Sequence, residues 1–340
     1  MIHTMEPWLG LSRALAVFLF AGIEKKKMAR KFLVTGGAGF IGSHIATALV
    51  ERGDDVVVLD NLSTGRRENL EHLGDRVDFH EGCLLDREQV ERALRGVEVV
   101  YHQAALASVP RSVAKPLDTN AACVTGTLNV LDAARQADVR RVVYAGSSSA
   151  YGDQPNMSKR ETDLPGPLSP YAAAKLAGES YCKAFTATYG LETVVIRYFN
   201  VFGPRQDPNS EYSAVIPIFV TKMVKGERPT IYGDGKQSRD FTYIDNVVQG
   251  NLAAADSTGA IGCSINVACG QQATLLQLVA AINEVLDTKI EPIFANARAG
   301  DVRESLADIT VARSVLDYEP QVEFDEGLRR SIEYYLSLVQ

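Results

Sequence analysis

The chain has 340 residues, of which 46% are hydrophobic and 23% are charged, a composition that excludes collagen-like, coiled-coil and largely disordered proteins. Lysine and arginine number 35 against 42 aspartates and glutamates, so the formal net charge is −7 and we expect no binding to nucleic acid. This length supports a large hydrophobic core, in one large or two unequal domains.

Residues 1–27 differ from the rest of the chain. A mostly apolar run covers residues 8–23 and is followed by three lysines. The run is shorter than the roughly 20 residues of a membrane-spanning helix, and a signal peptide would carry its charges before the run. We interpret residues 1–27 as a non-native or disordered leader, with natural translation starting at Met28, and we expect no membrane partner. A membrane-anchoring helix is the alternative.

The cysteine and histidine spacings do not indicate a metal site. None of the five cysteines belongs to a CxxC pair, and the five histidines show no HxxxH or HExxH spacing. An odd number of thiols in a long chain is typical of a reducing compartment. We therefore predict free cysteines, a cytoplasmic location and no bound metal.

From residue 31 onward, short apolar runs alternate with segments of helical periodicity. Strands are predicted at 31–35, 55–59, 77–80, 97–102, 141–146 and 193–198. Helices are predicted at 41–52, 88–94, 120–137 and 168–189. Because the strands are apolar throughout, both faces of their sheet should be covered, as in parallel sheets. The sequence predicts an α/β fold with a doubly wound parallel sheet of the Rossmann type.

The pattern changes from residue 200. Helices are predicted at 214–225, 275–286 and 328–338, with short strands at 230–234 and 264–267. We expect a Rossmann domain formed by residues 28–199 with about 240–268. A smaller C-terminal α/β lobe would comprise about 200–239 and 269–340.

A glycine-rich turn follows the first predicted strand and opens the first helix. Gly36, Gly39 and Gly42 would let the backbone turn sharply and approach a pyrophosphate at the helix N-terminus. The second strand leads to Asp60, whose carboxylate can accept hydrogen bonds from ribose hydroxyls and would repel a 2′-phosphate. This pair of features predicts NAD rather than NADP.

A tyrosine and a lysine four residues apart indicate acid–base chemistry. Tyr171 and Lys175 would share one helix face, where the ammonium would lower the pKa of the phenol. Three serines, 147–149, follow the fifth predicted strand at the end of the sheet where ligands bind. One of them could pass a proton between a substrate and Tyr171.

Taken in this order, the motifs resemble the extended short-chain dehydrogenase/reductase superfamily. They are most similar to nucleotide-sugar 4-epimerases of the UDP-galactose and UDP-N-acetylglucosamine type. The resemblance covers about residues 29–338. It rests on TGGAGFIG (35–42), DNLSTG (60–65), HQAA (102–105), SSSAYG (147–152), YAAAK (171–175), RYFNVFGPRQDP (197–208), GDGKQSRDFTYIDN (233–246) and RAGDVRES (298–305). It implies NAD as cofactor, a UDP-sugar as substrate, and a homodimer formed through helices 120–137 and 168–189.

The resemblance also implies roles for individual residues. Tyr171 would be the catalytic base beside Lys175, and Ser148, or else Ser149, would contact the sugar 4-hydroxyl. NAD would be held by Gly36, Gly39, Phe40, Ile41, Gly42, Asp60, Asn61, Ala104, Ala105, Asn120, Tyr171 and Lys175. The sugar nucleotide would contact Ser149, Asn200, Arg239, Arg298, Asp301 and Ser305.

Two positions depart from the family pattern. Cys83 follows Gly82 where relatives carry an acid near the adenine, so that contact is not assured here. Ser305 stands where enzymes limited to UDP-glucose and UDP-galactose have a large aromatic residue. The small side chain leaves volume for a 2-acetamido group. We therefore expect epimerisation of UDP-N-acetylglucosamine to UDP-N-acetylgalactosamine through a 4-keto intermediate, with UDP-glucose to UDP-galactose as a further reaction.

Three alternatives remain at this point. A UDP-glucuronate epimerase or decarboxylase would share the fold and needs a cation at the sugar carboxylate. A 4,6-dehydratase would carry an Asp-Glu pair after the fifth strand, where this chain has serines and alanine. A non-catalytic NAD-binding scaffold would commonly lack the base, whereas Tyr171 and Lys175 are both present.

Overall fold

The computed structural model of the chain describes residues 29–154, 156, 158–208, 214–297 and 303–338. The leader predicted at 1–27 and the predicted substrate residues Arg298 and Asp301 lie outside these ranges. Within them, no helix combines the length and the apolar character needed to cross a membrane.

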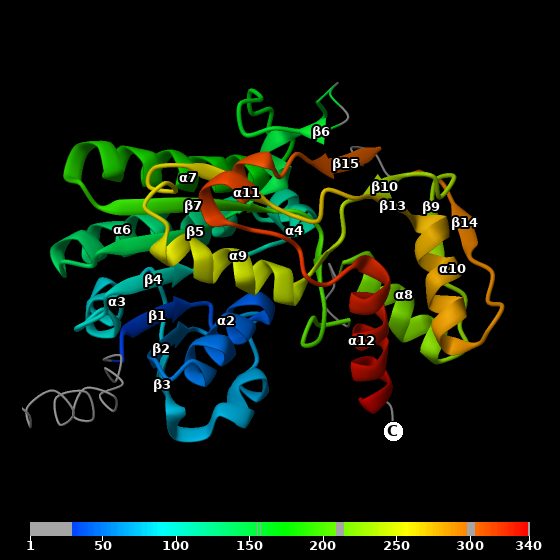
Figure 1. The fold of residues 1–340 in the computed structure, drawn as a ribbon, viewed down its shortest axis with the longest axis horizontal. Coiled ribbons are helices and arrows are strands. Elements are labelled where there is room, and N and C mark those ends of the chain that lie inside the picture. The colour runs from blue at the N-terminus through cyan, green and yellow to red at the C-terminus, as the bar shows by residue number, and fades with distance from the viewer. Residues whose placement is uncertain (1–28, 155, 157, 209–213, 298–302, 339–340) are drawn as a thin grey trace, which may run out of the picture.

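A seven-stranded sheet forms the centre of the larger part (Figure 1). In spatial order its strands are β12 (Ser264–Val267), β7 (Glu192–Tyr198), β5 (Arg141–Ser147), β4 (Val99–His102), β1 (Lys31–Thr35), β2 (Asp55–Asp60) and β3 (Val77–Glu81). All neighbouring pairs are parallel. This confirms the predicted doubly wound fold. The strand order reverses between β1 and β4, the place where such sheets bind ligands at their carboxyl ends.

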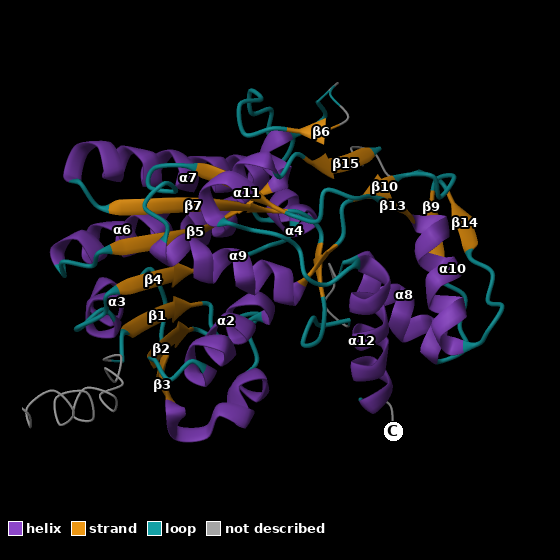
Figure 2. Ribbon diagram, viewed as in Figure 1, coloured by secondary structure: helices purple, strands orange, loops and turns teal. Residues whose placement is uncertain are grey.

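Helices cover both faces of this sheet (Figure 2). One face carries α2 (Phe40–Glu51) and α9 (Ile244–Asp256), and the other carries α3 (Arg87–Ala93), α6 (Gly126–Gln136) and α7 (Pro170–Tyr189). Successive strand residues enter opposite cores: Phe32 and Val34 pack in one, Leu33 in the other. Burial on both sides explains why the strands are apolar throughout.

The helix predicted at 120–137 is longer and less regular than expected. It begins as α5 (Pro116–Asn120), passes through a π-helical turn at Ala121–Thr125 and continues as α6. Another short helix, α4 (Val109–Ala114), precedes it, and a 3-10 helix spans Arg67–Arg76. π-Helical turns occur frequently at functional sites.

A smaller lobe lies beyond the carboxyl ends of the sheet, where Figure 1 shows a group of helices. They are α8 (Val215–Val224), α10 (Leu275–Leu286) and α12 (Phe324–Ser337). Short strands accompany them: β9 (Thr230–Tyr232) with β14 (Ile293–Ala295), β8 (Val201–Phe202) with β11 (Thr242–Tyr243), and a sheet ordered β13 (Ala273–Thr274), β10 (Ser238–Arg239), β15 (Glu304–Ala307) and β6 (Ser158–Lys159). α11 (Thr310–Leu316) leads back to the large sheet, packing on β12 and α9.

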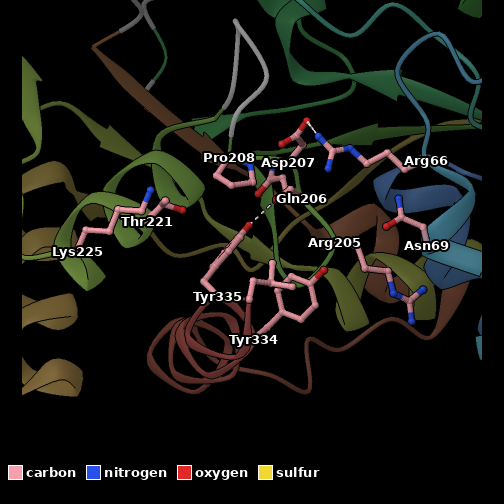
Figure 3. A pocket seen from close by; sticks show the side chains of 11 residues that line it. Arg66, Asn69, Arg205, Gln206, Asp207, Pro208, Thr221, Lys225, Tyr334 and Tyr335 are labelled. Carbon is pink, nitrogen blue, oxygen red and sulfur yellow. Dashed lines mark hydrogen bonds and ion pairs between the residues drawn. The ribbon is translucent and has the colours of Figure 1, made fainter. Parts of the chain in front are cut away.

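The chain after β8 runs between the two parts of the molecule beside a cavity of about 220 Å³ (Figure 3). Arg66 pairs with Asp207 at 2.6 Å, and the hydroxyl of Tyr335 donates to the carbonyl of Gln206 at 2.7 Å. None of the predicted site residues lines this cavity. The contacts of Arg66 and Tyr335 beside the cavity instead hold the segment after β8, which follows Asn200 in the chain.

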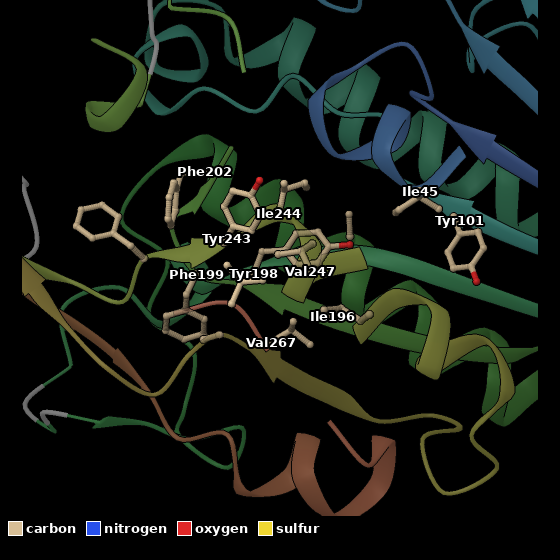
Figure 4. Packing of buried hydrophobic residues seen from close by; sticks show 14 of the residues in the cluster. Ile45, Tyr101, Ile196, Tyr198, Phe199, Phe202, Tyr243, Ile244, Val247 and Val267 are labelled. Carbon is tan, nitrogen blue, oxygen red and sulfur yellow. The ribbon is translucent and has the colours of Figure 1, made fainter. Parts of the chain in front are cut away.

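A continuous aromatic core joins the sheet to the lobe (Figure 4). The ring of Phe202 lies 5.6 Å from that of Tyr243, and Phe241 stacks on Phe324 of α12 at 5.5 Å. Phe202 lies in β8, two residues after Asn200, and Phe241 follows Arg239 of β10 by two residues, so both rings stand next to predicted substrate residues in the chain. The lobe is therefore held rigidly against the ends of the large sheet.

Candidate active site

The glycine turn after β1 is shaped for a close backbone approach. Gly36 has φ +68°, and a Cβ there would lie 2.7 Å from the backbone of Ala104. A Cβ on Gly42 would overlap the carbonyl oxygen of Gly36. α2 begins at Phe40, and its N-cap Gly39 supplies no side-chain hydrogen bond. The first amides of α2, including that of Ile41, are thus left for an anion such as a pyrophosphate.

Asp60 braces this turn against the end of β2. Its side chain is nearly buried, and its two oxygens accept hydrogen bonds from the backbone of Ala38 at 3.0 Å and of Leu62 at 2.8 Å. Burial raises the pKa of Asp60, while the two hydrogen bonds oppose that shift. Each carboxylate oxygen keeps a second lone pair, which suits ribose hydroxyls.

The structure places Cys83 beside the predicted ribose residue. The amide nitrogen of Asn61 lies 3.9 Å from Sγ of Cys83, and the backbone N–H of Cys83 donates to Gln89 of α3 at 2.7 Å. The Gln89 side chain therefore lies beside Cys83, at the carboxyl end of β3. The sequence carries no signal for Gln89, because nothing in its helix distinguishes it from a solvent-facing residue.

His102, at the end of β4, connects β1 to α6 through hydrogen bonds. Its Nδ1 lies 2.7 Å from the Thr35 hydroxyl and its Nε2 lies 2.9 Å from that of Thr127. Thr127 donates its own proton to the carbonyl of Cys123, so it must accept from Nε2–H. Burial lowers the pKa of His102 to about 3, which keeps the ring neutral. Thr35 also accepts from the backbone of Ala104 at 3.4 Å.

His102 thereby ties two predicted cofactor segments to β1. Ala104 and Ala105 follow β4 directly and are partly exposed opposite the glycine turn. Asn120 ends α5, is exposed, and precedes the π-helical turn whose Cys123 carbonyl closes the hydrogen-bond chain. His102 belongs to the HQAA motif (102–105), from which only the two alanines were predicted to contact the cofactor.

Tyr171 and Lys175 lie in the first turns of α7, as predicted. The helix starts there because Ser169 caps it by accepting from the N–H of Ala172 at 3.1 Å. Lys175 is buried, and its ammonium donates to the carbonyl of Ala145 in β5 at 2.8 Å. Burial lowers the pKa of Lys175, an effect that the nearby thiols oppose.

The expected lowering of the Tyr171 pKa by Lys175 is wrong for the protein without its cofactor. Burial raises the pKa of Tyr171, and the thiol of Cys123 adds to this shift. A hydrogen bond with Ser147 is the one lowering contribution, whereas Lys175 is committed to the Ala145 carbonyl. Desolvation of the phenol outweighs the charge of the neighbouring lysine.

The serines after β5 form a row of hydroxyls leading to Tyr171. Ser147 ends β5, caps the 3-10 helix Ser148–Tyr151, and has its hydroxyl 2.8 Å from that of Ser149. Ser147 is also the serine whose hydroxyl acts to lower the pKa of Tyr171. The hydroxyl of Ser148 takes no part in these bonds. These interactions favour Ser147, for which the motif predicted no role, as the partner of Tyr171, with Ser149 next to Ser147.

Three predicted substrate residues converge at the junction of the two parts. Asn200 follows β7 with φ +34° and donates to the backbone carbonyl of Asp240 at 3.2 Å. Arg239 of β10 and Ser305 of β15 are direct partners in a parallel pair. Asp240 lies between these segments. It belongs to the motif 233–246, but the motif predicted no role for it.

Comparisons with known proteins agree with this architecture. Residues 32–268 match the Epimerase family, described as the NAD dependent epimerase/dehydratase family. The UDP-glucose 4-epimerase of Mycolicibacterium smegmatis is 39% identical over 313 residues, covering 89% of this chain and 97% of that protein.

Solved structures give the same result. The UDP-N-acetylglucosamine 4-epimerase of Methanobrevibacter ruminantium M1, in complex with UDP-N-acetylmuramic acid, superposes with a TM-score of 0.88 at 41% identity, covering 91% of this chain and 99% of that one. The UDP-glucuronic acid 4-epimerase of Bacillus cereus, in complex with UDP-glucuronic acid and NAD, has a TM-score of 0.85 at 32% identity, with coverages of 91% and 99%.

Proposed function

Since the chain belongs to the NAD dependent epimerase/dehydratase family, we propose that it epimerises UDP-sugars at C4, with UDP-N-acetylglucosamine as its preferred substrate. The observation that carries the proposal is the group of side chains at the carboxyl end of β5: Ser147 and Ser149, whose hydroxyls lie 2.8 Å apart, and Tyr171, whose pKa burial raises and the Ser147 hydroxyl acts to lower. It lies on the same edge of the sheet as the glycine turn. We assign the cofactor to residues 28–199 with about 240–268, and the sugar nucleotide to the remaining lobe.

The residues present fit NAD. The glycine turn offers a cradle that a Cβ at Gly36 or Gly42 would fill, and α2 offers uncapped amides. Asp60 and Asn61 would accept the adenosine ribose, and Lys175 would reach the nicotinamide ribose. When bound, NAD would accept hydride from C4 of the sugar and return it to the opposite face.

Tyr171 would move the proton of the 4-hydroxyl. Burial alone holds its phenol protonated, so the tyrosine needs a positive charge in the cleft before it acts as a base near neutral pH. Ser147 and Ser149 would carry the proton between the sugar oxygen and the phenol. Lys175, held by the Ala145 carbonyl, would keep its ammonium at a fixed place in the cleft.

Asn200, Arg239 and Ser305 would hold the sugar nucleotide, together with Arg298 and Asp301. Arginine suits a diphosphate because its guanidinium donates in a planar fork. Ser305 occupies the position directly opposite Arg239, and its small side chain leaves volume for a 2-acetamido group. The likeness to an enzyme solved with an N-acetylated UDP-sugar supports this preference.

We further propose a two-fold homodimer through the face formed by α4, α5 and α7. Large apolar side chains are exposed there, with Val113 at 65%, Leu117 at 83% and Tyr189 at 55%. α6 contributes none of the large exposed apolar side chains. The proposed dimer face therefore lies nearer to α4 and α5 than the helix 120–137 predicted from the sequence. In a two-fold dimer the same apolar face of each protomer would be covered by its copy. A monomer by light scattering at micromolar concentration would contradict this assembly.

The test incubates the purified protein, without added cofactor, with UDP-N-acetylglucosamine, UDP-glucose and UDP-glucuronate in parallel, and follows the products by NMR. We expect conversion of the acetamido sugar to its galacto epimer by co-purified NAD. Turnover of UDP-glucose alone would support 4-epimerisation of a UDP-sugar but overturn the proposed role of Ser305 in admitting a 2-acetamido group. Turnover of UDP-glucuronate alone would favour the uronate enzymes, and no turnover despite bound NAD would favour a non-catalytic protein.

A further inference from the structure

Asp240 is a buried carboxylate that binds three separate backbone segments of the lobe. Its side chain is fully buried. One oxygen accepts from the N–H of Cys269 at 3.0 Å, and the other accepts from the N–H groups of Gly270 at 3.0 Å and Ala307 at 3.2 Å. Among the residues that the structure describes, no cationic side chain forms an ion pair with it.

The backbone of Asp240 adds two further contacts, both to predicted substrate segments. Its N–H donates to the carbonyl of Ser305 at 2.7 Å, and its carbonyl accepts from the side chain of Asn200 at 3.2 Å. Arg239 precedes it directly in β10. One residue therefore connects Asn200, Arg239 and Ser305, which come from three different parts of the chain.

The three amides explain why an aspartate stands here. A carboxylate offers about four lone pairs and no proton, so it can accept from all three N–H groups at once. Asparagine would turn an NH₂ group toward one of them, and serine has a single oxygen. Burial opposes the charge and raises the pKa of Asp240 to about 7, with the three hydrogen bonds acting against that shift. The ionised form is thus costly for folding and is held by the segments that it joins.

We propose that Asp240 is a positioning residue of the sugar-nucleotide site, which sets Asn200, Arg239 and Ser305 relative to one another without touching the substrate. The inference rests on the proposed function of these three residues. Loss of the carboxylate should loosen β15 and the 269–270 turn against β10. The expected result is weaker binding of the sugar nucleotide, while Tyr171 and the bound NAD, on the large sheet, keep their geometry.

The experiment compares the wild-type holoenzyme with Asp240→Asn and with Asp245→Asn. Asp245 lies on α9, is half-exposed and pairs with Arg330, so this control makes the same chemical change away from the substrate segments. For Asp240→Asn we expect UDP affinity by calorimetry to fall and KM for the UDP-sugar to rise by roughly 10- to 100-fold, with kcat and NAD content much less changed. Asp245→Asn should behave as the wild type.

Wild-type UDP affinity and KM in the folded, NAD-containing Asp240→Asn protein would overturn the inference. Because UDP binding needs no turnover, this failure is distinct from failure of the proposed function, which is an inactive wild type. An equal loss of kcat, NAD and thermal stability would indicate a general structural role and would also overturn it.

A second measurement needs no variant and covers the case in which Asp240→Asn does not fold. The affinity of wild-type enzyme for UDP-N-acetylglucosamine should fall as pH drops through about 7, because protonation removes an acceptor from Asp240. The titratable groups facing Asp240 are Cys269 and Tyr318, both with raised pKa values, and the flanking charges are Arg239 and Arg303. An affinity that stays flat between about pH 6 and 8 would contradict the proposal.

Discussion

The two sides of the candidate site are built in different ways. On the cofactor side the glycine turn is made within residues 36–42, where Gly42 packs on Gly36, and Asp60 binds the backbone of Leu62 two residues on and of Ala38, 22 residues earlier. On the substrate side, Asp240 binds residues 269, 270 and 307, which are far away in the chain. Local turns constrain the sequence around them, whereas distant contacts do not leave a pattern in any one segment.

The supporting strands differ in the same sense. The cofactor turn follows β1, which is paired along its whole length with β2 and over Phe32–Thr35 with β4. β10, β13 and β6 have two residues each, too few for backbone pairing alone to fix them. Side-chain bonds to backbone groups, such as those of Asp240, therefore determine the substrate side. Changes there should alter substrate binding, while changes on the large sheet should affect chemistry and cofactor retention.

The largest effect is expected for Tyr171→Phe, which removes the proposed base and leaves the ring in place. We expect kcat to fall by about 10²- to 10⁴-fold, the usual contribution of a positioned acid or base. NAD content and UDP affinity should not change, because the hydroxyl contributes to neither the glycine turn nor the lobe.

Tyr181→Phe on the same helix is the matched control, since its side chain is 38% exposed and lies outside the proposed site. Steady-state rates and the absorbance of bound cofactor provide the two readings. A Tyr171→Phe enzyme with a wild-type rate would eliminate the tyrosine as the base.

The next effect concerns the cofactor side alone. In Gly42→Ala the new methyl group would overlap the carbonyl of Gly36, so α2 must shift away from the turn. Overpacking of this kind costs about 1–3 kcal/mol, and we expect NAD affinity to drop roughly 10- to 100-fold. UDP affinity should be retained, because the lobe does not contact this overlap.

Gly259→Ala is the control, since a methyl group there meets nothing closer than 3.8 Å. NAD released on denaturation, together with calorimetry of the apoprotein, measures the change. Equal loss of NAD and UDP affinity would show that the two sides are less independent than their construction suggests.

A smaller effect separates the serines. Ser147→Ala removes the hydroxyl that acts to lower the pKa of Tyr171, and we expect a fall in kcat of about 10-fold. Ser149→Ala should have a smaller effect and Ser148→Ala the smallest. Pre-steady-state rates on UDP-N-acetylglucosamine would rank the three variants, and Ser148→Ala as the slowest would restore the preference drawn from the sequence.

The sequence was sufficient for the large sheet and the glycine turn, because periodicity and glycine spacing are properties of contiguous segments. It correctly predicted that Tyr171 and Lys175 share one helix. It did not predict the direction of the Tyr171 pKa shift, because desolvation depends on what packs around the ring. Strands of two residues, such as β10, have no periodicity to detect. Ser147 could not be distinguished from its neighbours, since the turn that follows β5 decides which hydroxyl faces α7.

The last prediction concerns the contact between α2 and the segment after β8, where the two sides meet. Nε2 of His44 lies 3.0 Å from the carbonyl of Pro204, and burial lowers the pKa of His44 to about 4. The folded protein therefore holds a neutral ring that would be protonated below about pH 6.5 in the unfolded chain. This contribution to stability is fully present above pH 6.5 and is lost as pH falls through about 4. Since unfolding takes up one proton in that window, the free energy of unfolding should change by at most about 1.4 kcal/mol per pH unit through His44.

His44→Gln, which can still donate to Pro204, should remove that pH dependence of the free energy of unfolding and leave turnover near pH 8 unchanged. Denaturant titrations from about pH 4 to 8 measure both curves. If they ran parallel, the junction would not depend on a neutral His44, and the segment after β8 would be held by its other contacts: Arg66–Asp207, Tyr335, and Arg205, which donates to Ser43 and Thr47 of α2.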